Sequence, residues 1–308
     1  MSNLKQAIKQ NYVKCVKNPT YFINQYCIIQ HPQRGKIKFK LYPFQEDVLK
    51  EYQKNDYNVV LKSRQLGIST LSAAYSLWLM LFHNDKNVLC IATTKDTAKN
   101  LVTKVRIMYE ALPAWLKTAI VENNKLSLVF KNGSQIKAIA SNESAGRSEA
   151  LSLLILDEAA FIEKIDTIWT AAQQTLATGG KCLAISTPNG VGNWFHKTWI
   201  DATDEVNKFN TVKLHWSEHP ERDEEWRREQ DRILGPSQAA QECDADFLSS
   251  GRSVVDPAVL EWYKDKMCCD PVEKSGFDRN LWIWDYPNYS KNYLICADVA
   301  RGDGTDFS

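Results

Sequence analysis

Short apolar runs and helical patterns alternate through the middle of the chain. The apolar runs predict five strands, at residues 58–62, 87–93, 151–156, 181–186 and 210–216. Apolar positions at helical spacing predict one helix in each interval between these strands, near residues 69–83, 96–111, 166–177 and 192–202. Strands that alternate with helices are typical of a mainly parallel sheet with helices packed against it. We therefore expect an α/β fold.

A hairpin is predicted before the strand at 151–156. Residues 126–140 read LSLVFKNGSQIKAIA, which is two alternating runs separated by a turn containing Asn132 and Gly133. Asn-Gly favours a two-residue type I′ turn, because both central residues of that turn need a positive φ. We expect this hairpin to extend one edge of the sheet.

The composition changes after Trp216. A charged helix, ERDEEWRREQDRIL, is predicted at 221–234 and a second helix near 238–247, followed by an irregular stretch and then a new strand pattern, YLICADVARG. The residues before Leu41 form a basic, aromatic leader with two helical pieces. These changes divide the chain into four parts, at residues 1–40, 41–216, 217–289 and 290–308.

Charge and hydropathy narrow the possible classes of protein. The chain has 308 residues and a net charge of +1, which excludes a globally basic nucleic-acid binder, so any contact with DNA must come from a local patch. The longest apolar stretch, residues 71–82, is too short to span a bilayer and contains two serines. We expect a soluble, cytosolic protein without membrane contacts.

Residues 62–70, KSRQLGIST, resemble a phosphate-binding loop placed between a strand and a helix. In the usual G-x-x-x-x-G-K-[ST] loop, backbone N–H groups surround the phosphates, Lys reaches the β and γ oxygens, and the hydroxyl holds Mg²⁺. On this frame Gly67 is the second Gly and Ser69 is the hydroxyl, whereas Lys62 replaces the first Gly and Ile68 replaces the Lys. The site needs one ammonium within reach of the phosphates, and Lys62 can supply it from the end of its strand.

The loop by itself is equally consistent with an ordinary strand–turn–helix, and its position favours the nucleotide site. It follows the β-branched pair Val59-Val60 and precedes a long helix whose amino end attracts anions. Arg64 lies inside the loop, where it can neutralise charge on the γ-phosphate. The predicted ATP-binding residues of the loop are Lys62, Ser63, Arg64, Gln65, Leu66, Gly67, Ile68, Ser69 and Thr70.

An acidic pair follows another buried strand. The run LILDE places Asp157 and Glu158 at the carboxyl end of this strand, where open α/β sheets bind their ligands. We expect Asp157 to hold Mg²⁺ and Glu158 to orient and polarise the water that attacks the γ-phosphate. The alternative is that the two acids only cap the segment that follows.

Three further features fit a nucleotide site. Ser186, Thr187 and Pro188 end the next strand, where polar groups can sense the γ-phosphate, although Thr-Pro-Asn-Gly is also simply a turn. Gln45, in LYPFQ, has an amide suited to an adenine edge. Arg147, in SAGRSEAL, is a candidate arginine finger, although a single Arg on a polar loop is commonly just solvated.

These motifs together resemble the N-terminal portion of the large terminase of tailed bacteriophages. The resemblance extends over the whole chain and rests on LYPFQ, KSRQLGIST, GRSEALSLLILDEAAFIE, AISTPNGVGNWF, QECDADFLSSG and ADVARGDGTDFS. It implies a P-loop NTPase of the ASCE type with a small, mostly helical second subdomain, to which the leader also belongs. It implies an adenine-contacting motif at Gln45, Walker A at 62–70, Walker B with its catalytic carboxylate at Asp157 and Glu158, and a coupling motif at 186–188.

The resemblance also implies a second activity. Large terminases typically continue into an RNase H-like nuclease that uses two divalent metals, and Asp298 matches the first of its ligands, at the end of that domain's first strand. The other ligands would follow Ser308, so we expect this chain to be a fragment in which residues 290–308 begin the nuclease.

The expected function is ATP hydrolysis coupled to translocation of double-stranded DNA into a procapsid. The resemblance implies a homo-oligomeric ring on the portal protein, a small terminase subunit as partner, and a location in the host cytoplasm, bound transiently to the procapsid portal and absent from the mature virion. One alternative is a helicase-like, DNA-stimulated ATPase, which should carry a second RecA-like core. The other is a non-catalytic terminase remnant that binds nucleotide or portal without turnover.

Overall fold

The chain forms two compact units, Met1–Val254 and Val255–Ser308. The structure is a computed structural model that describes residues 2–31, 33–141, 150–247, 259, 262–263, 266–276, 281–292 and 294. The candidate site lies entirely in the first unit.

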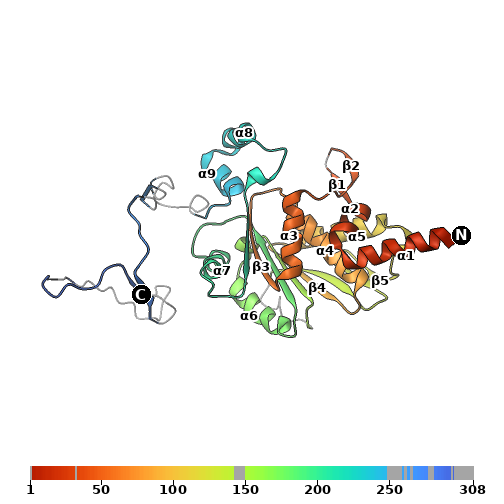
Figure 1. Cartoon of the computed structure of the whole chain (residues 1–308), viewed down its shortest axis with the longest axis horizontal. Helices are drawn as coiled ribbons and strands as arrows, with labels where there is room; N and C mark the ends of the chain where they lie inside the picture. The colour runs from red at the N-terminus through yellow and green to blue at the C-terminus, as the bar shows by residue number, and fades with distance from the viewer. Residues whose placement is uncertain are drawn as a thin grey trace. The chain divides into compact units, whose positions relative to one another are not determined.

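The first unit is built around an eight-stranded sheet of order β10-β3-β9-β8-β4-β7-β6-β5 (Figure 1). Its strands are β3 (Tyr57–Lys62), β4 (Asn87–Ala92), β5 (Ile120–Asn123), β6 (Ser127–Phe130), β7 (Gln135–Ala140), β8 (Leu153–Asp157), β9 (Lys181–Ser186) and β10 (Asn210–Leu214). All neighbours from β10 to β7 run parallel, and β6 and β5 add antiparallel strands at one edge. The five strands predicted from apolar runs are confirmed as β3, β4, β8, β9 and β10.

Helices cover both faces of this sheet. One face carries α1 (Ser2–Lys17), α2 (Pro19–Tyr26), α3 (Pro43–Lys54), α4 (Ile68–Phe82) and α5 (Lys95–Ala111), and the other carries α6 (Ile165–Leu176) and α7 (Trp194–Thr203). Successive residues of a strand point to opposite faces, so Val60 packs in the first core and Val59 in the second. The central strands are therefore buried on both sides, which explains their continuous apolar sequences. The four predicted helices are confirmed as α4, α5, α6 and α7.

The predicted hairpin is confirmed as β6 and β7, and it extends the sheet edge as expected. The predicted type I′ turn is wrong, because Asn132 is not among the residues with positive φ, whereas Gly133 has a φ of 79°. Gly133 N–H donates to Phe130 O and Phe130 N–H donates to Ser134 O, the pattern of a three-residue loop with a left-handed glycine. The Asn132 side chain instead donates to Met80 O and His83 O, which satisfies carbonyls at the end of α4.

The charged segment after the sheet begins its helix later than the sequence pattern predicted. Helix α8 spans Glu224–Leu234, because Asp223 accepts a hydrogen bond from Trp226 N–H and so caps the helix there. The second predicted helix is present as α9 (Pro236–Ala239) followed by the π-helical η4 (Ala240–Asp244). Arg222 consequently precedes α8 and is not one of its helical residues.

The remaining described elements are small. In the first unit they are β1 (Ile28–His31), β2 (Gly35–Lys38), η1 (Ala114–Leu116), η2 (Ala159–Phe161) and η3 (Trp216–Glu218), and in the second unit they are the antiparallel pair β11 (Glu273–Ser275) and β12 (Leu281–Ile283). This pair lies in the stretch predicted to be irregular. The predicted strand around 293–302 lies outside the described residues apart from position 294. Among the described residues, none of the helices combines the length and apolarity that a bilayer span requires.

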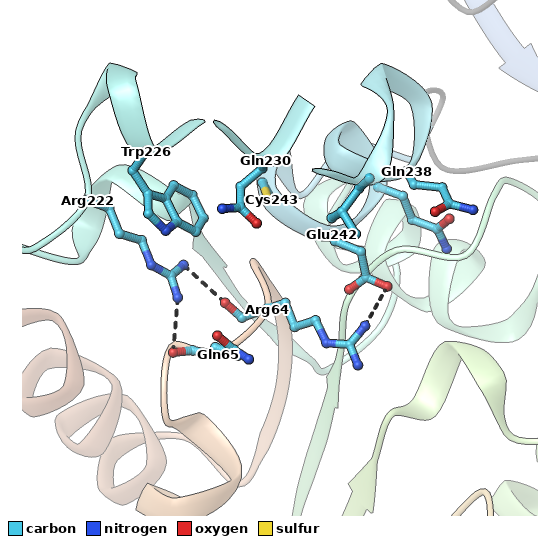
Figure 2. Close-up of a pocket in the computed structure, with 10 residues that line it drawn as sticks. Arg64, Gln65, Arg222, Trp226, Gln230, Gln238, Glu242 and Cys243 are labelled. Atoms are coloured by element: carbon cyan, nitrogen blue, oxygen red, sulfur yellow. Dashed lines mark hydrogen bonds and ion pairs between the residues drawn. The ribbon is translucent and has the colours of Figure 1, made fainter. Parts of the chain in front are cut away.

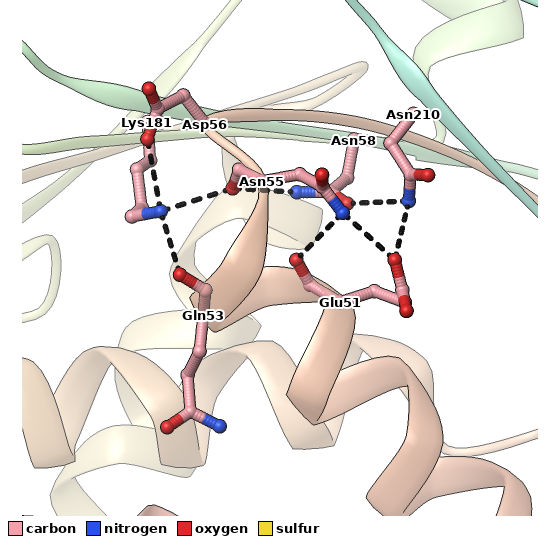
Figure 3. A network of polar contacts seen from close by, with 7 residues as sticks. All are labelled: Glu51, Gln53, Asn55, Asp56, Asn58, Lys181 and Asn210. Atoms are coloured by element: carbon pink, nitrogen blue, oxygen red, sulfur yellow. Dashed lines mark hydrogen bonds and ion pairs between the residues drawn. The ribbon is translucent and has the colours of Figure 1, made fainter.

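A polar network fixes the amino ends of β3, β9 and β10 (Figure 3). Glu51, on α3, accepts hydrogen bonds from Asn55 (2.8 Å) and Asn210 (3.1 Å), and Asn210 also donates to Asn58. Lys181 donates to the carbonyls of Gln53 and Asn55 and pairs with Asp56 at 3.1 Å. These contacts bind the end of α3 to the amino edge of the sheet. The candidate site lies at the opposite, carboxyl edge.

Candidate active site

The phosphate loop (residues 62–70) joins the carboxyl end of β3 to the first turn of α4. Gln65 (φ 60°) and Gly67 (φ 75°) have left-handed conformations, which direct successive N–H groups toward one side. In the part of the chain that the structure describes, the N–H groups of Gln65, Leu66 and Gly67 have no hydrogen-bond partner. With the free amides at the start of α4 they form the concave set of donors that binds anions.

Both departures from the usual P-loop pattern have a structural explanation. Ile68, in the place of the usual Lys, is the first residue of α4, is 1% exposed and packs in the core. Lys62 is the last residue of β3 and is 4% exposed, with its ammonium 3.0 Å from Glu158 Oε1. The ammonium nearest the acidic pair therefore comes from the start of the loop.

The acidic pair lies across one strand from the loop. Asp157 ends β8, and β9 lies between β8 and β3. Glu158 follows in a left-handed conformation (φ 55°), which is unfavourable for a residue other than glycine and is typical of functional sites. This turn directs the Glu158 carboxylate back to Lys62. Asp157 and Glu158 therefore face the phosphate loop, and the alternative of a simple helix cap does not explain their contacts, because Glu158 makes no capping hydrogen bond to η2.

The residues present fit a magnesium ion. Ser69 Oγ lies 2.8 Å from Asp157 Oδ1, so a hydroxyl and a carboxylate oxygen converge beside the anion-binding amides. Mg²⁺ prefers such oxygen ligands and is commonly held by one or two protein groups together with phosphates and water. No cluster of three or more His, Cys, Asp or Glu side chains suited to a metal occurs among the described residues.

Burial, neighbouring groups and two lysines affect the pKa of Asp157. Burial and the neighbouring Glu158 raise the pKa of Asp157, while the Ser69 hydrogen bond, Lys62 and Lys104 lower it. Lys104 is on α5, and burial lowers the pKa of its ammonium while Asp157 raises it. Cations from both β3 and α5 thus favour the charged form of Asp157, against the effect of burial.

The strand end after the acidic pair contacts two other segments. Ser186 ends β9 between the other two strands, and its Oγ accepts a hydrogen bond from Ala160 N–H at 3.1 Å. Thr187 is 3% exposed, and Pro188 O accepts a hydrogen bond from Gln241 at 3.3 Å. Residues 186–188 therefore contact both the segment after the acidic pair and η4.

Gln45 contacts the phosphate loop and not open solvent. Its amide is 3% exposed, with Oε1 accepting from Tyr42 N–H at 3.1 Å and Nε2 donating to Leu66 O at 2.9 Å. A Cβ on Gly67 would lie 2.7 Å from Gln45 Nε2. Gln45 thus supports the loop directly, and its contact with adenine remains a prediction.

The remaining predicted residues are less central. The Arg64 side chain is 66% exposed, and its guanidinium pairs with Glu242 of η4 at 3.0 Å (Figure 2). Ser63 is buried, with its N–H donated to Leu214 O, and Thr70 lines a cavity beside Lys104. Arg147 and Asp298 lie outside the described residues.

Sequence reasoning missed Arg222, Glu242 and Lys104. Arg222 and Glu242 belong to charged segments that give no local sign of a site, and they reach the phosphate loop only through the fold. Lys104 could have been identified from the sequence. Helical spacing places it on the same apolar face of α5 as Leu101, Val105 and Met108, where a charged residue is unusual.

The fold and this site define a P-loop NTPase of the ASCE type. A phosphate loop follows one parallel strand, an Asp-Glu pair ends another, and one further strand lies between them. Residues 59–255, more than half of the chain, match the family described as terminase large subunit, T4likevirus-type, N-terminal. The chain belongs to this family.

Solved structures show the same fold. The ATPase domain of the large terminase of Thermus phage P74-26 is 24% identical, with a TM-score of 0.56 over 68% of this chain and 94% of that one. The large terminase of bacteriophage HK97 is 21% identical (TM-score 0.55; 82% of this chain and 52% of that one). The large terminase of a thermophilic bacteriophage, solved in complex with ADP, is 16% identical (TM-score 0.53; 66% of this chain and 52% of that one). This chain thus spans about half the length of the last two proteins.

Proposed function

We propose that this chain hydrolyses ATP to drive double-stranded DNA into a procapsid, as the motor part of a large terminase. The observation that carries the proposal is a pair of contacts at the phosphate loop: Ser69 bonds to Asp157, and Lys62 bonds to Glu158. These four side chains supply a metal-binding pair, a phosphate-binding ammonium and a carboxylate for the attacking water.

The chemistry follows from what each group contributes. The loop amides and Lys62 bind the phosphate oxygens, which requires the ammonium to leave Glu158. When bound to Ser69 and Asp157, Mg²⁺ neutralises charge on the β and γ oxygens. The freed Glu158 carboxylate then orients a water toward the γ-phosphate and polarises it. We assign Arg147 and Arg64 to neutralising the charge that develops on the γ-phosphate, a role for which the Arg64 guanidinium must leave Glu242.

The coupling role of residues 186–188 rests on their contacts. Ser186 is bonded to the segment that follows Glu158, and Pro188 is bonded to η4. A change at the γ-phosphate can therefore reach η4 through one strand end. We propose that this is how hydrolysis moves the helical segment of α8, α9 and η4 against the core, whereas the leader helices α1 and α2 pack in that core.

Family membership supports the wider setting. We propose that the subunits form a ring on the portal protein, with a small terminase subunit as partner, in the host cytoplasm and only while the procapsid is filled. We propose that Asp298 is a metal ligand of an RNase H-like nuclease that uses two divalent metals. The large terminase of the thermophilic bacteriophage binds ADP in its crystal structure, which supports ATP as the nucleotide here.

The first alternative, a helicase-like ATPase, lacks support from the chain. The described part of the first unit contains one large sheet with one phosphate loop, and residues 59–255 match a terminase family. The second alternative, a non-catalytic remnant, is suggested in part by Ile68, which stands in the place of the usual Lys. The Lys62–Glu158 contact supports an active site instead, because it provides the amine that Ile68 does not.

The test is phosphate release by the 308-residue chain with ATP and Mg²⁺, with and without double-stranded DNA. We expect turnover that DNA stimulates. Tight ATP binding without turnover under both conditions would identify the remnant. Equal stimulation by single-stranded DNA, with strand separation, would identify the helicase-like enzyme.

A further inference from the structure

Arg222 contacts the outer side of the phosphate loop. Its guanidinium donates to Arg64 O at 3.1 Å and to Gln65 O at 3.3 Å (Figure 2), and it approaches Ser63 Oγ at 3.5 Å. These acceptors belong to three successive residues of the loop. One side chain from the segment between η3 and α8 therefore binds much of the loop's outer side.

The position of Arg222 is itself fixed. Its guanidinium lies 4.4 Å from the centre of the Trp226 ring, and Trp226 packs against Trp216, with ring centres 5.9 Å apart. Arg222 N–H donates to His219 O, which holds the backbone just before α8. A guanidinium between an aromatic face and two carbonyls is well ordered, because its planar donors match both.

The planar geometry of the peptide group links the carbonyls on the outer side of the loop to the N–H groups on its inner side. In a planar trans peptide the C=O of one residue and the N–H of the next point in opposite directions. Holding Arg64 O and Gln65 O outward therefore directs the N–H groups of Gln65 and Leu66 inward. These N–H groups are among those without a partner in the described structure, and they belong to the anion-binding concavity.

The loop needs such support because its conformation is costly. Gln65 has a φ of 60°, a left-handed conformation that a residue with a side chain adopts only when its surroundings hold it there. The loop also borders a cavity of about 440 Å³ lined by Arg222, Trp226 and Glu242, so no packed side chains fill that side. From η4, Glu242 O accepts the Arg64 N–H at 2.7 Å, which fixes the loop just before the strained residue.

We propose that Arg222 is a positioning residue for nucleotide binding: by bonding two outward carbonyls of the phosphate loop, it pre-organises the amides that bind the phosphates. The inference rests on the proposed ATP site and adds to it a residue outside the loop and the acidic strand. Arg222 acts through the loop and does not touch the nucleotide.

The test compares Arg222→Met, Arg222→Lys and Arg228→Met in the 308-residue chain. Met keeps an unbranched stem over Trp226 and removes the donors, whereas Lys keeps the charge but cannot bond both carbonyls in the planar geometry of Arg. Arg228 is an exposed residue of α8 in the described structure and serves as the matched control for the loss of one positive charge. ATP binding is measured by calorimetry, hydrolysis by steady-state kinetics, and the fold by the melting temperature without nucleotide.

We expect Arg222→Met to raise the dissociation constant and the KM for ATP about tenfold. We expect the kcat at saturating ATP to stay within about threefold of the wild-type value, because bound nucleotide restores the conformation of the loop. The KM of Arg222→Lys should lie between those of the wild type and Arg222→Met.

Wild-type affinity in Arg222→Met, full rescue by Lys, or an equal loss in Arg228→Met would overturn the inference. If Arg222→Met melts early, Arg222→Lys decides alone: wild-type affinity overturns the proposal and a raised KM supports it. Failure of the wild-type chain to bind ATP would instead overturn the proposed function.

Discussion

Lys62 Nζ lies 3.0 Å from Glu158 Oε1, so the ammonium that we propose to bind the phosphates and the carboxylate that we propose to orient the attacking water are paired with each other. The Lys62 side chain is 6% exposed and that of Glu158 is 33% exposed. In the proposed mechanism a nucleotide replaces Glu158 as the partner of Lys62 and thereby frees the carboxylate. The proposal thus links nucleotide binding and activation of the water through one ion pair.

Lys62→Ala is expected to abolish ATP binding, with a dissociation constant raised about 100-fold or more, because the buried ammonium is the charge that meets the phosphates. The fold should survive, since the partly exposed Glu158 can be hydrated once its partner is removed. Calorimetry with ATP measures the loss. Lys181→Ala is the matched control, because Lys181 begins β9 at the opposite edge of the sheet and should leave affinity unchanged. Normal hydrolysis by Lys62→Ala would show that another residue supplies the amine.

Glu158→Gln should bind ATP and fail to hydrolyse it. The amide keeps the size of the side chain but cannot polarise water, so we expect the kcat to fall about 100-fold or more with little change in affinity. Phosphate release under single-turnover conditions checks this directly. Glu163→Gln removes an exposed carboxylate from the segment that follows and should behave as wild type. A Glu158→Gln chain with wild-type kcat would remove Glu158 from the mechanism.

Asp157→Asn tests the magnesium ligand. Changing even an outer-shell partner of a metal costs roughly 10- to 100-fold in affinity, and Asp157 is assigned to the metal itself, so half-maximal activity should need at least about tenfold more Mg²⁺. Stability should change little, because burial already raises the pKa of Asp157 and Asn carries no charge. Titration of activity with Mg²⁺ and a thermal melt separate the two effects. An unchanged Mg²⁺ requirement would contradict the assignment.

Gly67→Ala should damage both the fold and the site. The left-handed φ costs about 1–2 kcal/mol for a residue with a side chain. The new Cβ would also lie 2.7 Å from Gln45 Nε2, so the Gln45 amide must shift, and loss of its bond to Leu66 O would add roughly 1–3 kcal/mol. Gly35→Ala is the matched control, since Gly35 has a φ of 67° and open space where its Cβ would be. Chemical denaturation should give the larger loss for Gly67→Ala, and equal losses would show that the Gln45 contact contributes nothing.

Much of the fold can be predicted from the sequence, because the patterns that indicate its strands and helices involve residues close together in the chain. A strand buried on both faces must be apolar along its whole length, so β3, β4, β8 and β9 were visible as continuous runs. The Asp157-Glu158 pair was visible because polar residues that end such a run must lie at the sheet edge. The hairpin turn was misjudged because Asn132 bonds the end of α4, a tertiary contact that the dipeptide cannot reveal.

By itself, the sequence determined the parallel α/β class, the phosphate loop and the acidic strand end, because strand burial, helix periodicity and loop chemistry depend on neighbouring residues. The tertiary structure alone decided which groups meet. It placed β9 between the loop strand and the acidic strand, brought Lys62 to Glu158 although they are 96 positions apart, and bonded Gln45 and Arg222 to the loop. Such contacts join residues far apart in the chain, and their partners are fixed by strand order and helix packing, which no local pattern encodes.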